Sequence, residues 1–523
     1  MKRARLVRTS FHIAAVALVL SAATSIHAAV DHTGLYATHC AACHGADRLG
    51  GTGPALLPGN LKRLRKPAAI EAVTIGRPAT QMPEFADKLD TTQIQALVDF
   101  IYTPPDSTPH WGATEISASR AVHRRPETLD STPDFAADPL NLFVVVEVGD
   151  HHATILDGDR LEVIHRFPTR FALHGGPKYS PDGRFVFFGS RDGWVSKYDL
   201  YNLSLIAEIR AGINMRNIAV SGDGRYVMAA NYLPHTLVLL DAGTLELIKV
   251  IPAADRSGAS SRVSAVYAAP PRGSFIVALK DVPEVWEVSY DDNASGNRSD
   301  RAHNYTAELT NKEQAGQFPI RRIALQEILD DFFFDQDYRL VIGAARDGGG
   351  QVVDLDAARK LASLALPGLP HLGSGITWEY KGRNVLATPN LKAGAVSIID
   401  METWETVRKL ETLGPGFFMR SHENSPYAWV DVFFGPHRDA VHVIDKNTLD
   451  IVKTLRPAPG KTAAHVEFTR DGRHALLSVW DMDGAIVVYD SHSLKEIKRL
   501  PMKKPSGKYN VWNKISGSRG TSH

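Results

Sequence analysis

The chain has 523 residues, of which 44% are hydrophobic and 22% are charged. That length exceeds one ordinary core, so we expect at least two domains, and the composition excludes a disordered or collagen-like chain. Lysine and arginine number 59 against 58 acidic residues, for a net charge of +1. This balance provides no basic surface for a polyanion, so we expect no nucleic-acid partner.

The N-terminus has the pattern of a secretory signal. Basic residues precede an apolar run over 11–23, and alanines follow at 28 and 29; the basic residues are Lys2, Arg3, Arg5 and Arg8. The run of roughly 13 residues is shorter than the ~20 needed to span a bilayer. We therefore expect a signal peptide over 1–29, export to the periplasm and no membrane span after cleavage; an uncleaved anchor is the alternative.

A haem attachment motif, Cys40-Ala-Ala-Cys43-His44, contains both cysteines of the chain. Two cysteines in an exported protein would ordinarily form a disulfide, but a disulfide gives no reason for the histidine that follows at once. In haem c both thiols are bonded to the vinyl groups and the histidine binds the iron. We therefore predict covalent haem c on Cys40 and Cys43, with His44 as an iron ligand.

A short helical domain is expected around this motif. Apolar residues recur with helical spacing over 68–75 and 91–102, and Met82 stands in a turn between these segments. A thioether is a common second axial ligand of haem c, where it raises the reduction potential; a methionine that only fills the core is the alternative. We expect an all-α cytochrome c domain over 30–103, with Met82 as the second ligand.

The character of the sequence changes after residue 103. Residues 104–139 mix proline, serine, threonine and charge, which predicts a linker draped over the second domain. From residue 140 onward, short β-rich runs alternate with turn signals. An Asp-Gly-Arg turn that begins a strand recurs at 182–184, 223–225 and 471–473.

The first two of these turns are about 41 residues apart, which matches one four-stranded blade of a β-propeller. Dividing the ~380 residues after the linker by this length gives about eight blades, and seven would also fit. We predict an all-β eight-bladed propeller over 140–523, with function in its central channel. The charged stretch 291–317 is expected to be an excursion from one blade.

A cytochrome c domain followed by a propeller of this size resembles the cytochrome cd1 nitrite reductases and their relatives that bind haem d1. The likeness covers nearly the whole mature chain. The sequence motifs that carry this resemblance are residues 171–174, 212–216, 283–285, 370–375 and 506–511.

The resemblance implies a second tetrapyrrole, haem d1 or dihydro-haem d1, bound without a covalent link in the propeller. His174 matches the histidine that binds its iron on the proximal side. Arg191 and Arg216 match arginines of the same pocket, where guanidinium groups can pair with the carboxylates of the macrocycle. Tyr232 and Arg262 are further candidates for this role. An ordinary turn histidine and solvated arginines are the alternatives.

Two features separate this sequence from the nitrite reductases. Those enzymes place two histidines above the iron to deliver protons to nitrite, and only the second, His371, has a match here; the first falls near Leu329. The sequence is more similar to the paralogous dihydro-haem d1 dehydrogenases. There the counterpart of His371 binds the iron from the distal side, and a histidine matching His465 lies by the macrocycle. A strand histidine packed in a blade is the alternative for His465.

The resemblance implies oxidation of a propionate arm of dihydro-haem d1 to an acrylate, the last step of haem d1 biosynthesis, with electrons leaving through haem c. His465 is the predicted base, because the ordinary pKa of histidine lies near neutrality. The expected partners are the tetrapyrrole substrate, a cytochrome cd1 nitrite reductase that receives the product, and a small electron-acceptor protein. A nitrite reductase, a non-catalytic haem d1 carrier and an electron-transfer protein with no second cofactor are the alternatives.

Overall fold

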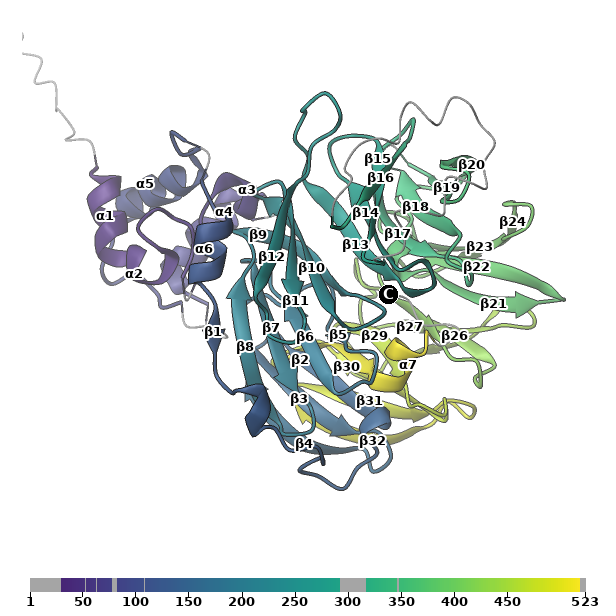
Figure 1. The fold of residues 1–523 in the computed structure, drawn as a ribbon. Helices are drawn as coiled ribbons and strands as arrows, with labels where there is room; N and C mark the ends of the chain where they lie inside the picture. Colours follow the sequence, from purple (N-terminus) through teal and green to yellow (C-terminus); the bar gives the residue numbers. More distant parts are fainter. Residues whose placement is uncertain are drawn as a thin grey trace, which may run out of the picture.

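The computed structural model describes residues 30–517, with the exception of 52, 63, 78–81, 108, 292–316 and 346–347. The expected signal peptide over 1–29 and most of the expected excursion over 291–317 lie outside the described residues. A small helical domain lies beside a large ring of β-sheets (Figure 1). Within the described ranges, no helix has the length and apolar character needed to cross a bilayer.

The helical domain is built around the haem attachment motif. Its helices are α1 His32–His39, α2 Ala41–His44, α3 Pro58–Leu61, α4 Lys66–Ile75 and α5 Thr91–Tyr102. A capping box between Asp90 and Gln93 fixes the start of α5. Helix α4 begins two residues before the expected start, because Pro67 fits the first turn of a helix. The buried face of α5 packs against α1 and α4 and forms the core of this domain.

The ring consists of eight sheets in the part of the chain that the structure describes. From the innermost strand outward, the first three sheets are β33 Pro505–Asn510, β2 Leu142–Glu147, β3 His152–Asp157 and β4 Glu162–Pro168; β5 Lys178–Tyr179, β6 Phe185–Gly189, β7 Trp194–Asp199 and β8 Ser204–Arg210; and β9 Asn214–Val220, β10 Tyr226–Leu233, β11 Thr236–Asp241 and β12 Leu247–Pro252. The next three sheets are β13 Val263–Ala269, β14 Ser274–Leu279, β15 Glu284–Ser289 and β16 Ile320–Ala324; β17 Leu329–Phe334, β18 Leu340–Ala345, β19 Gly350–Asp354 and β20 Arg359–Leu364; and β21 Ile376–Tyr380, β22 Arg383–Pro389, β23 Ala395–Asp400 and β24 Thr406–Glu411. The last two sheets are β25 Met419–Ser421, β26 Tyr427–Asp431, β27 Val441–Asp445 and β28 Ile451–Leu455; and β29 Ala463–Phe468, β30 His474–Val479, β31 Gly484–Asp490 and β32 Glu496–Met502.

The first strand of each sheet lines the central channel. First strands of neighbouring sheets, such as β9, β13 and β17, pack side by side, whereas outer strands such as β24 and β32 are largely exposed. Hydrophobic clusters fill the space between adjacent sheets. This is an eight-bladed β-propeller, and the prediction from the spacing of the Asp-Gly turns is confirmed. The three turns come immediately before β6, β10 and β30.

The first blade is closed by a strand from the other end of the ring. Strand β33 pairs with β2, with Tyr509 opposite Val144. The hydroxyl of Ser506 donates to the carbonyl of Val146 at 3.0 Å. Helix α7, Val511–Ile515, follows β33 and covers part of the same blade. Residues near position 509 therefore stand beside residues of the first blade.

The segment expected to be a linker follows the surface of the propeller. It contains helix α6 Ala113–Ala118, strand β1 Ala121–Val122 and the 3-10 helices η1 Pro126–Thr128 and η2 Pro139–Asn141. Strand β1 extends its blade by pairing with β8. Ile116 is fully buried between two blades, so this segment contributes to the core as well as connecting the domains.

The two domains are in direct contact near the haem attachment motif. Ala55 and Leu57 of the helical domain pack against Ile213 of the propeller. The guanidinium of Arg210 donates to the carbonyl of Leu49. Figure 1 shows α3 beside the blade that contains β9 and β12. These contacts hold the haem-bearing loop on the propeller.

Candidate functional site

The junction of α1 and α2 presents the residues expected to hold haem c. Cys40 and Cys43 are free thiols, and burial raises the pKa of Cys40 to about 11. Nδ1 of His44 lies 2.8 Å from the carbonyl oxygen of Pro54, so Nδ1–H donates and Nε2 remains for a metal. Gly53 lies so close that a Cβ there would be 2.8 Å from Cε1 of His44. Two free thiols and a histidine oriented by a carbonyl fit covalent haem c.

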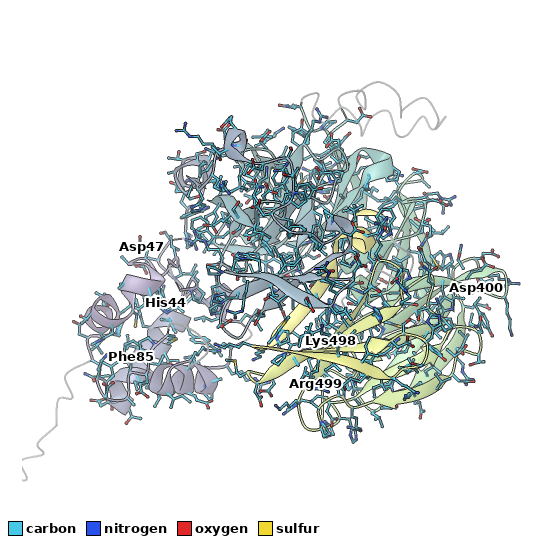
Figure 2. All side chains as sticks on the ribbon, turned by 90° about the horizontal axis from the view of Figure 1, so that it is seen from below. His44, Asp47, Phe85, Asp400, Lys498 and Arg499 are labelled. Atoms are coloured by element: carbon cyan, nitrogen blue, oxygen red, sulfur yellow. The ribbon has the colours of Figure 1, made fainter. Side chains whose placement is uncertain are left out.

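Met82 lies in the loop between α4 and α5. Its carbonyl accepts the N–H of Arg77 at 3.0 Å, and a Cβ at Gly76, where φ is +70°, would lie 2.9 Å from that carbonyl. Figure 2 shows His44 and Phe85, which follows Met82 by three residues, within the helical domain. The loop is therefore held in place by its own backbone, and Met82 as the second ligand stays a prediction.

In the propeller, His174 lies in the loop between β4 and β5. Its Nδ1 is 2.7 Å from the carbonyl oxygen of Arg216, so Nδ1–H donates and Nε2 carries the lone pair. Nη2 of Arg191 lies 2.9 Å from this Nε2, and Nη1 of Arg216 lies 3.2 Å from it. The structure thus brings together the histidine and the two arginines that the sequence singled out.

The turn after His174 depends on two glycines. Gly175 and Gly176 have φ values of +82° and +69°, a region that residues with a Cβ rarely adopt. A Cβ at Gly176 would lie 2.8 Å from Cε1 of Tyr509. The His174 loop therefore packs directly on the ring of Tyr509.

Asp331 holds the other side of Arg216. Its Oδ2 lies 3.3 Å from Nη2 of Arg216, and its Oδ1 accepts the hydroxyl of Tyr267 at 2.9 Å. Nζ of Lys178 lies 5.6 Å from the centre of the Tyr267 ring. Burial lowers the pKa of Lys178 to about 8, although the charge of Asp331 acts in the opposite direction. Arg216 and Lys178 are thus the two cations on which the carboxylate of Asp331 acts.

His371 precedes the 3-10 turn η5, Leu372–Ser374, on the same side of the channel. Its Nδ1 lies 2.5 Å from the carbonyl oxygen of Phe417, so its Nε2 is also left without the proton. Burial lowers its pKa, with the charge of Asp331 opposing. A Cβ at Gly373 would lie 2.4 Å from Oδ2 of Asp331. His371 and His174 are therefore connected through Asp331 and Arg216.

Tyr232 and Arg262 take up different positions relative to this group. The ring of Tyr232 has Arg191 at 5.8 Å, and Arg262 and Lys280 at 5.6 Å each, from its centre. Arg262 donates through Nε and Nη2 to both oxygens of Asp281, at 2.9 and 2.6 Å. Tyr232 thus joins the site through Arg191, whereas Arg262 reaches it only across the tyrosine ring.

His465 occupies a β-bulge on the channel-lining strand β29. The pairing of β29 with β30 shifts register between Ala464 and Val466, and φ of His465 is +55°, which is uncommon for a residue other than glycine. Its N–H donates to Oδ2 of Asp431 at 3.2 Å. Bulges redirect a side chain out of the regular alternation and concentrate beside active sites.

The imidazole of His465 is 1% exposed. It meets the rings of Phe418 and Tyr509 edge-on, with centroid distances of 4.8 and 5.1 Å. Among the described residues, its Nε2 has no hydrogen-bond partner, which costs about 1–3 kcal/mol for a buried polar atom. This is the signature of a group whose partner is a ligand or a water.

His465 was chosen as the base because the ordinary pKa of histidine lies near neutrality, and its surroundings shift that pKa. Burial lowers the pKa of His465 well below its usual range, and any positive charge on the neighbouring Lys508 lowers it further. The imidazole is therefore neutral at neutral pH. It is in the form that can accept a proton, although as a weaker base than an exposed histidine.

Several residues of this site were not assigned a role from the sequence. They are Lys178, Tyr267, Asp331, Lys508 and Tyr509. The motif over 506–511 contains the last two and was a usable signal. The first three lie on different blades, so only the closed ring brings them together.

A bonded route links the helical domain to His174. Nε of Arg210 donates to the carbonyl of Asp192 at 2.9 Å, and its Nη2 donates to Leu49 beside the haem attachment motif. Asp192 is the neighbour of Arg191, which contacts His174. The two predicted sites are therefore connected by hydrogen bonds and a short length of chain.

Two families match the two parts of the chain. Residues 137–514 match the family described as the cytochrome D1 heme domain. Residues 28–101 match the family described as cytochrome C oxidase, cbb3-type, subunit III.

Similar proteins cover most of the chain. A dihydro-heme d1 dehydrogenase from Pseudomonas aeruginosa is 58% identical over 492 residues, which are 94% of this chain and 95% of the relative. Protein NirF from the same species is 29% identical over 374 residues, 70% of this chain and 90% of the relative. A solved structure described as dihydro-heme d1 dehydrogenase NirN in complex with DHE has a TM-score of 0.86 and 57% identity, covering 92% of this chain and 99% of that one.

Proposed function

The chain belongs to the family of the cytochrome D1 haem domain, and from that premise we propose that it is a dihydro-haem d1 dehydrogenase. It oxidises a propionate side chain of dihydro-haem d1 to an acrylate. Two adjacent carbons of the arm each lose a hydrogen, so that two protons and two electrons leave and a carbon–carbon double bond forms. Such a reaction needs a base beside the arm, an electron acceptor and a fixed orientation of the substrate.

His174 and His371 are assigned to the iron of the substrate. Both donate Nδ1–H to a backbone carbonyl, which is the arrangement that orients a metal-binding histidine and leaves Nε2 as the ligand atom. Arg191 lies against Nε2 of His174, so its guanidinium has to move when the tetrapyrrole binds. The movement frees Arg191 to pair with a carboxylate of the macrocycle.

The surplus of positive charge supports an anionic tetrapyrrole. Arg216 is paired with Asp331, the charge of Asp331 also acts on Lys178, and Arg191 lies against His174. Guanidinium groups bind carboxylates through two parallel hydrogen bonds. These side chains therefore hold the carboxylates at the rim of the macrocycle and fix the orientation of the reacting arm.

The observation that carries the proposal is the buried, unpartnered Nε2 of His465. The ring of His465 packs on Tyr509, and the loop that carries His174 approaches the same tyrosine at Gly176, which supports a shared site. A carbon of the propionate arm is the group that fits there. His465 then takes one proton from that carbon, the second hydrogen is released to solvent as a proton, and the two electrons pass on one at a time.

The electrons leave toward the helical domain. Haem c, when it is bound at Cys40, Cys43 and His44, supplies a one-electron acceptor that a small electron-acceptor protein can reoxidise. Arg210 holds the haem-bearing loop against the segment that follows Arg191. Export to the periplasm, where covalent haem c is attached, and delivery of the product to a cytochrome cd1 nitrite reductase are part of the same proposal.

A direct assay tests the proposal. Protein carrying haem c is loaded with dihydro-haem d1, and a one-electron oxidant is added. The bound tetrapyrrole is then followed by its absorption spectrum and by mass spectrometry after extraction. The expected result is loss of two hydrogens with a shift to the spectrum of haem d1. Recovery of unchanged dihydro-haem d1 would favour a carrier, and production of nitric oxide from nitrite at a comparable rate would favour a reductase.

A further inference from the structure

Lys508 is fully buried on the channel-lining strand β33. Its Nζ donates to the backbone carbonyl of His465 and lies 3.5 Å from Nδ1 of the same residue. Strands β29 and β33, which carry the two residues, pack side by side. Lysine is rarely buried completely, and burial of an ammonium group is costly in free energy. A buried lysine next to the imidazole of His465 therefore indicates a specific role.

We infer that Lys508 is a positioning residue for His465: its side-chain nitrogen accepts Nδ1–H of the imidazole and thereby leaves the lone pair on Nε2, toward the substrate. The inference rests on the proposed function, in which His465 is the base. Lys508 is bonded to the backbone of the base, and the role proposed for it acts through His465.

The hydrogen-bonding capacity of the two forms of lysine decides between two tautomers. A neutral amine has one lone pair and two hydrogens, so it can accept from Nδ1 and donate to the carbonyl of His465. An ammonium has no lone pair and can only donate to Nδ1, which puts the imidazole hydrogen on Nε2 and removes the base. The reaction therefore requires the neutral amine.

The surroundings of Lys508 favour the neutral form. Burial lowers its pKa well below the usual range; the carboxylates of Glu467 and Asp431 oppose this effect, and Arg420 reinforces it. Since the guanidinium of Arg420 acts on the buried Lys508 and stays protonated, a further proton on Lys508 is unfavourable.

Two substitutions separate positioning from a structural role. Lys508→Met keeps the length of the side chain and removes its hydrogen bonds. Lys508→Arg keeps a donor for the carbonyl of His465, but it is permanently charged and cannot accept from Nδ1. Lys197→Met is the matched control, because Lys197 is also buried and donates to a backbone carbonyl, that of Gly243, at 2.8 Å. For each protein, the affinity for dihydro-haem d1 and the single-turnover rate of its oxidation are measured separately.

The inference predicts an unusual order of rates. Lys508→Met is expected to bind the substrate with parental affinity and to oxidise it about 10- to 100-fold more slowly, as is typical when a group that orients a functional histidine is lost. Lys508→Arg is expected to be slower than Lys508→Met, and Lys197→Met to match the parent. A purely structural role predicts the reverse order, because arginine still anchors the carbonyl.

The remaining outcomes are also decisive. An arginine variant that is at least as fast as the methionine variant, or a methionine variant at the parental rate, overturns the inference. If the arginine variant does not bind the substrate, the rate of the methionine variant alone tests the inference. If neither variant binds the substrate, Lys508 has a structural role and the inference is wrong. His465→Ala, assayed in parallel, separates the two proposals. If His465→Ala oxidises the substrate at the parental rate, His465 is not the base and its proposed role fails. If His465→Ala is inactive while Lys508→Met keeps the parental rate, only the inference about Lys508 fails.

Discussion

The guanidinium of Arg191 lies against the imidazole of His174, with 2.9 Å between Nη2 and Nε2. Because Nδ1 of the same histidine is bonded to the carbonyl of Arg216, Nε2 is the only ring nitrogen that can bind iron. If His174 binds the iron as proposed, the guanidinium stands where the metal would bind. Binding of the tetrapyrrole would then break this contact and release the guanidinium for a carboxylate of the ligand.

His174→Ala is expected to weaken the binding of dihydro-haem d1 and to abolish the low-spin spectrum of an iron held by two histidines. The arginines remain, so some binding persists. Titration followed by absorption and electron paramagnetic resonance spectra measures both effects. His165→Ala, which removes a histidine from the outer strand β4, is the control. An unchanged spectrum in His174→Ala would rule out the proximal assignment.

His371→Ala is expected to convert the iron to a form with an open coordination position while leaving most of the affinity intact. The reason is that His371 is held by the carbonyl of Phe417, whereas Arg191 and Arg216 contact His174 and remain in the variant. Addition of a small external ligand such as imidazole should restore the low-spin spectrum. If the variant keeps the parental spectrum before imidazole is added, another residue is the distal ligand.

Met82→Ala is expected to retain covalent haem c and to lower its reduction potential. The thioether bonds need only Cys40 and Cys43, whereas the sulfur ligand stabilises ferrous iron. A redox titration and the sulfur-to-iron absorption band report on the ligand. Persistence of that band in the variant would mean that a different group binds the iron.

His465→Ala is expected to oxidise bound dihydro-haem d1 ~100- to 10,000-fold more slowly, the range typical of a lost general base. Haem c and substrate binding should be unaffected. His442→Ala provides the control, since His442 is also buried in the propeller and is bonded to Thr454. A variant that turns over at the parental rate would make His465 a packing residue.

The affinity for the tetrapyrrole is expected to fall as the pH rises above about 8. Burial lowers the pKa of Lys178 to about 8, so the side chain is protonated below that pH and neutral above it. Carboxylates of the ligand favour the protonated form, and binding above pH 8 must therefore take up a proton. Lys178→Met should bind more weakly below pH 8 and should lose this part of the pH dependence. A parallel pH profile for both proteins would exclude Lys178 from the binding site.

The architecture could be predicted because local signals repeat. The Asp-Gly turns of the propeller and the apolar spacing of α4 and α5 are short-range patterns, and both correspond to elements of the structure. Helix α6 and strand β1 escaped prediction. They are short, and the burial of Ile116 depends on two blades that no local pattern places beside it.

Part of the candidate site could also be predicted from short sequence motifs. His174 and Arg216 belong to recognisable motifs, Arg191 was matched through the resemblance alone, and the three meet in the structure. Asp331 and Tyr267 contact each other across blades, so their partnership follows from ring geometry alone. The bulge that turns His465 also has no sequence signature, because a positive φ at a histidine breaks the usual preference for glycine.

The pairing of β33 with β2 joins residues 360 positions apart in the chain, and this fixes an order of assembly. In the order of the chain, Cys40 and Cys43 come early, whereas Lys508 and Tyr509 come only after all other blades. Until then β2 has an unpaired edge that invites wrong contacts, and pairings over such a distance are slow to form. Attachment of the covalent haem and binding of the second tetrapyrrole are thus separate events in time, and a chain interrupted before β33 would carry the first group with no place for the second.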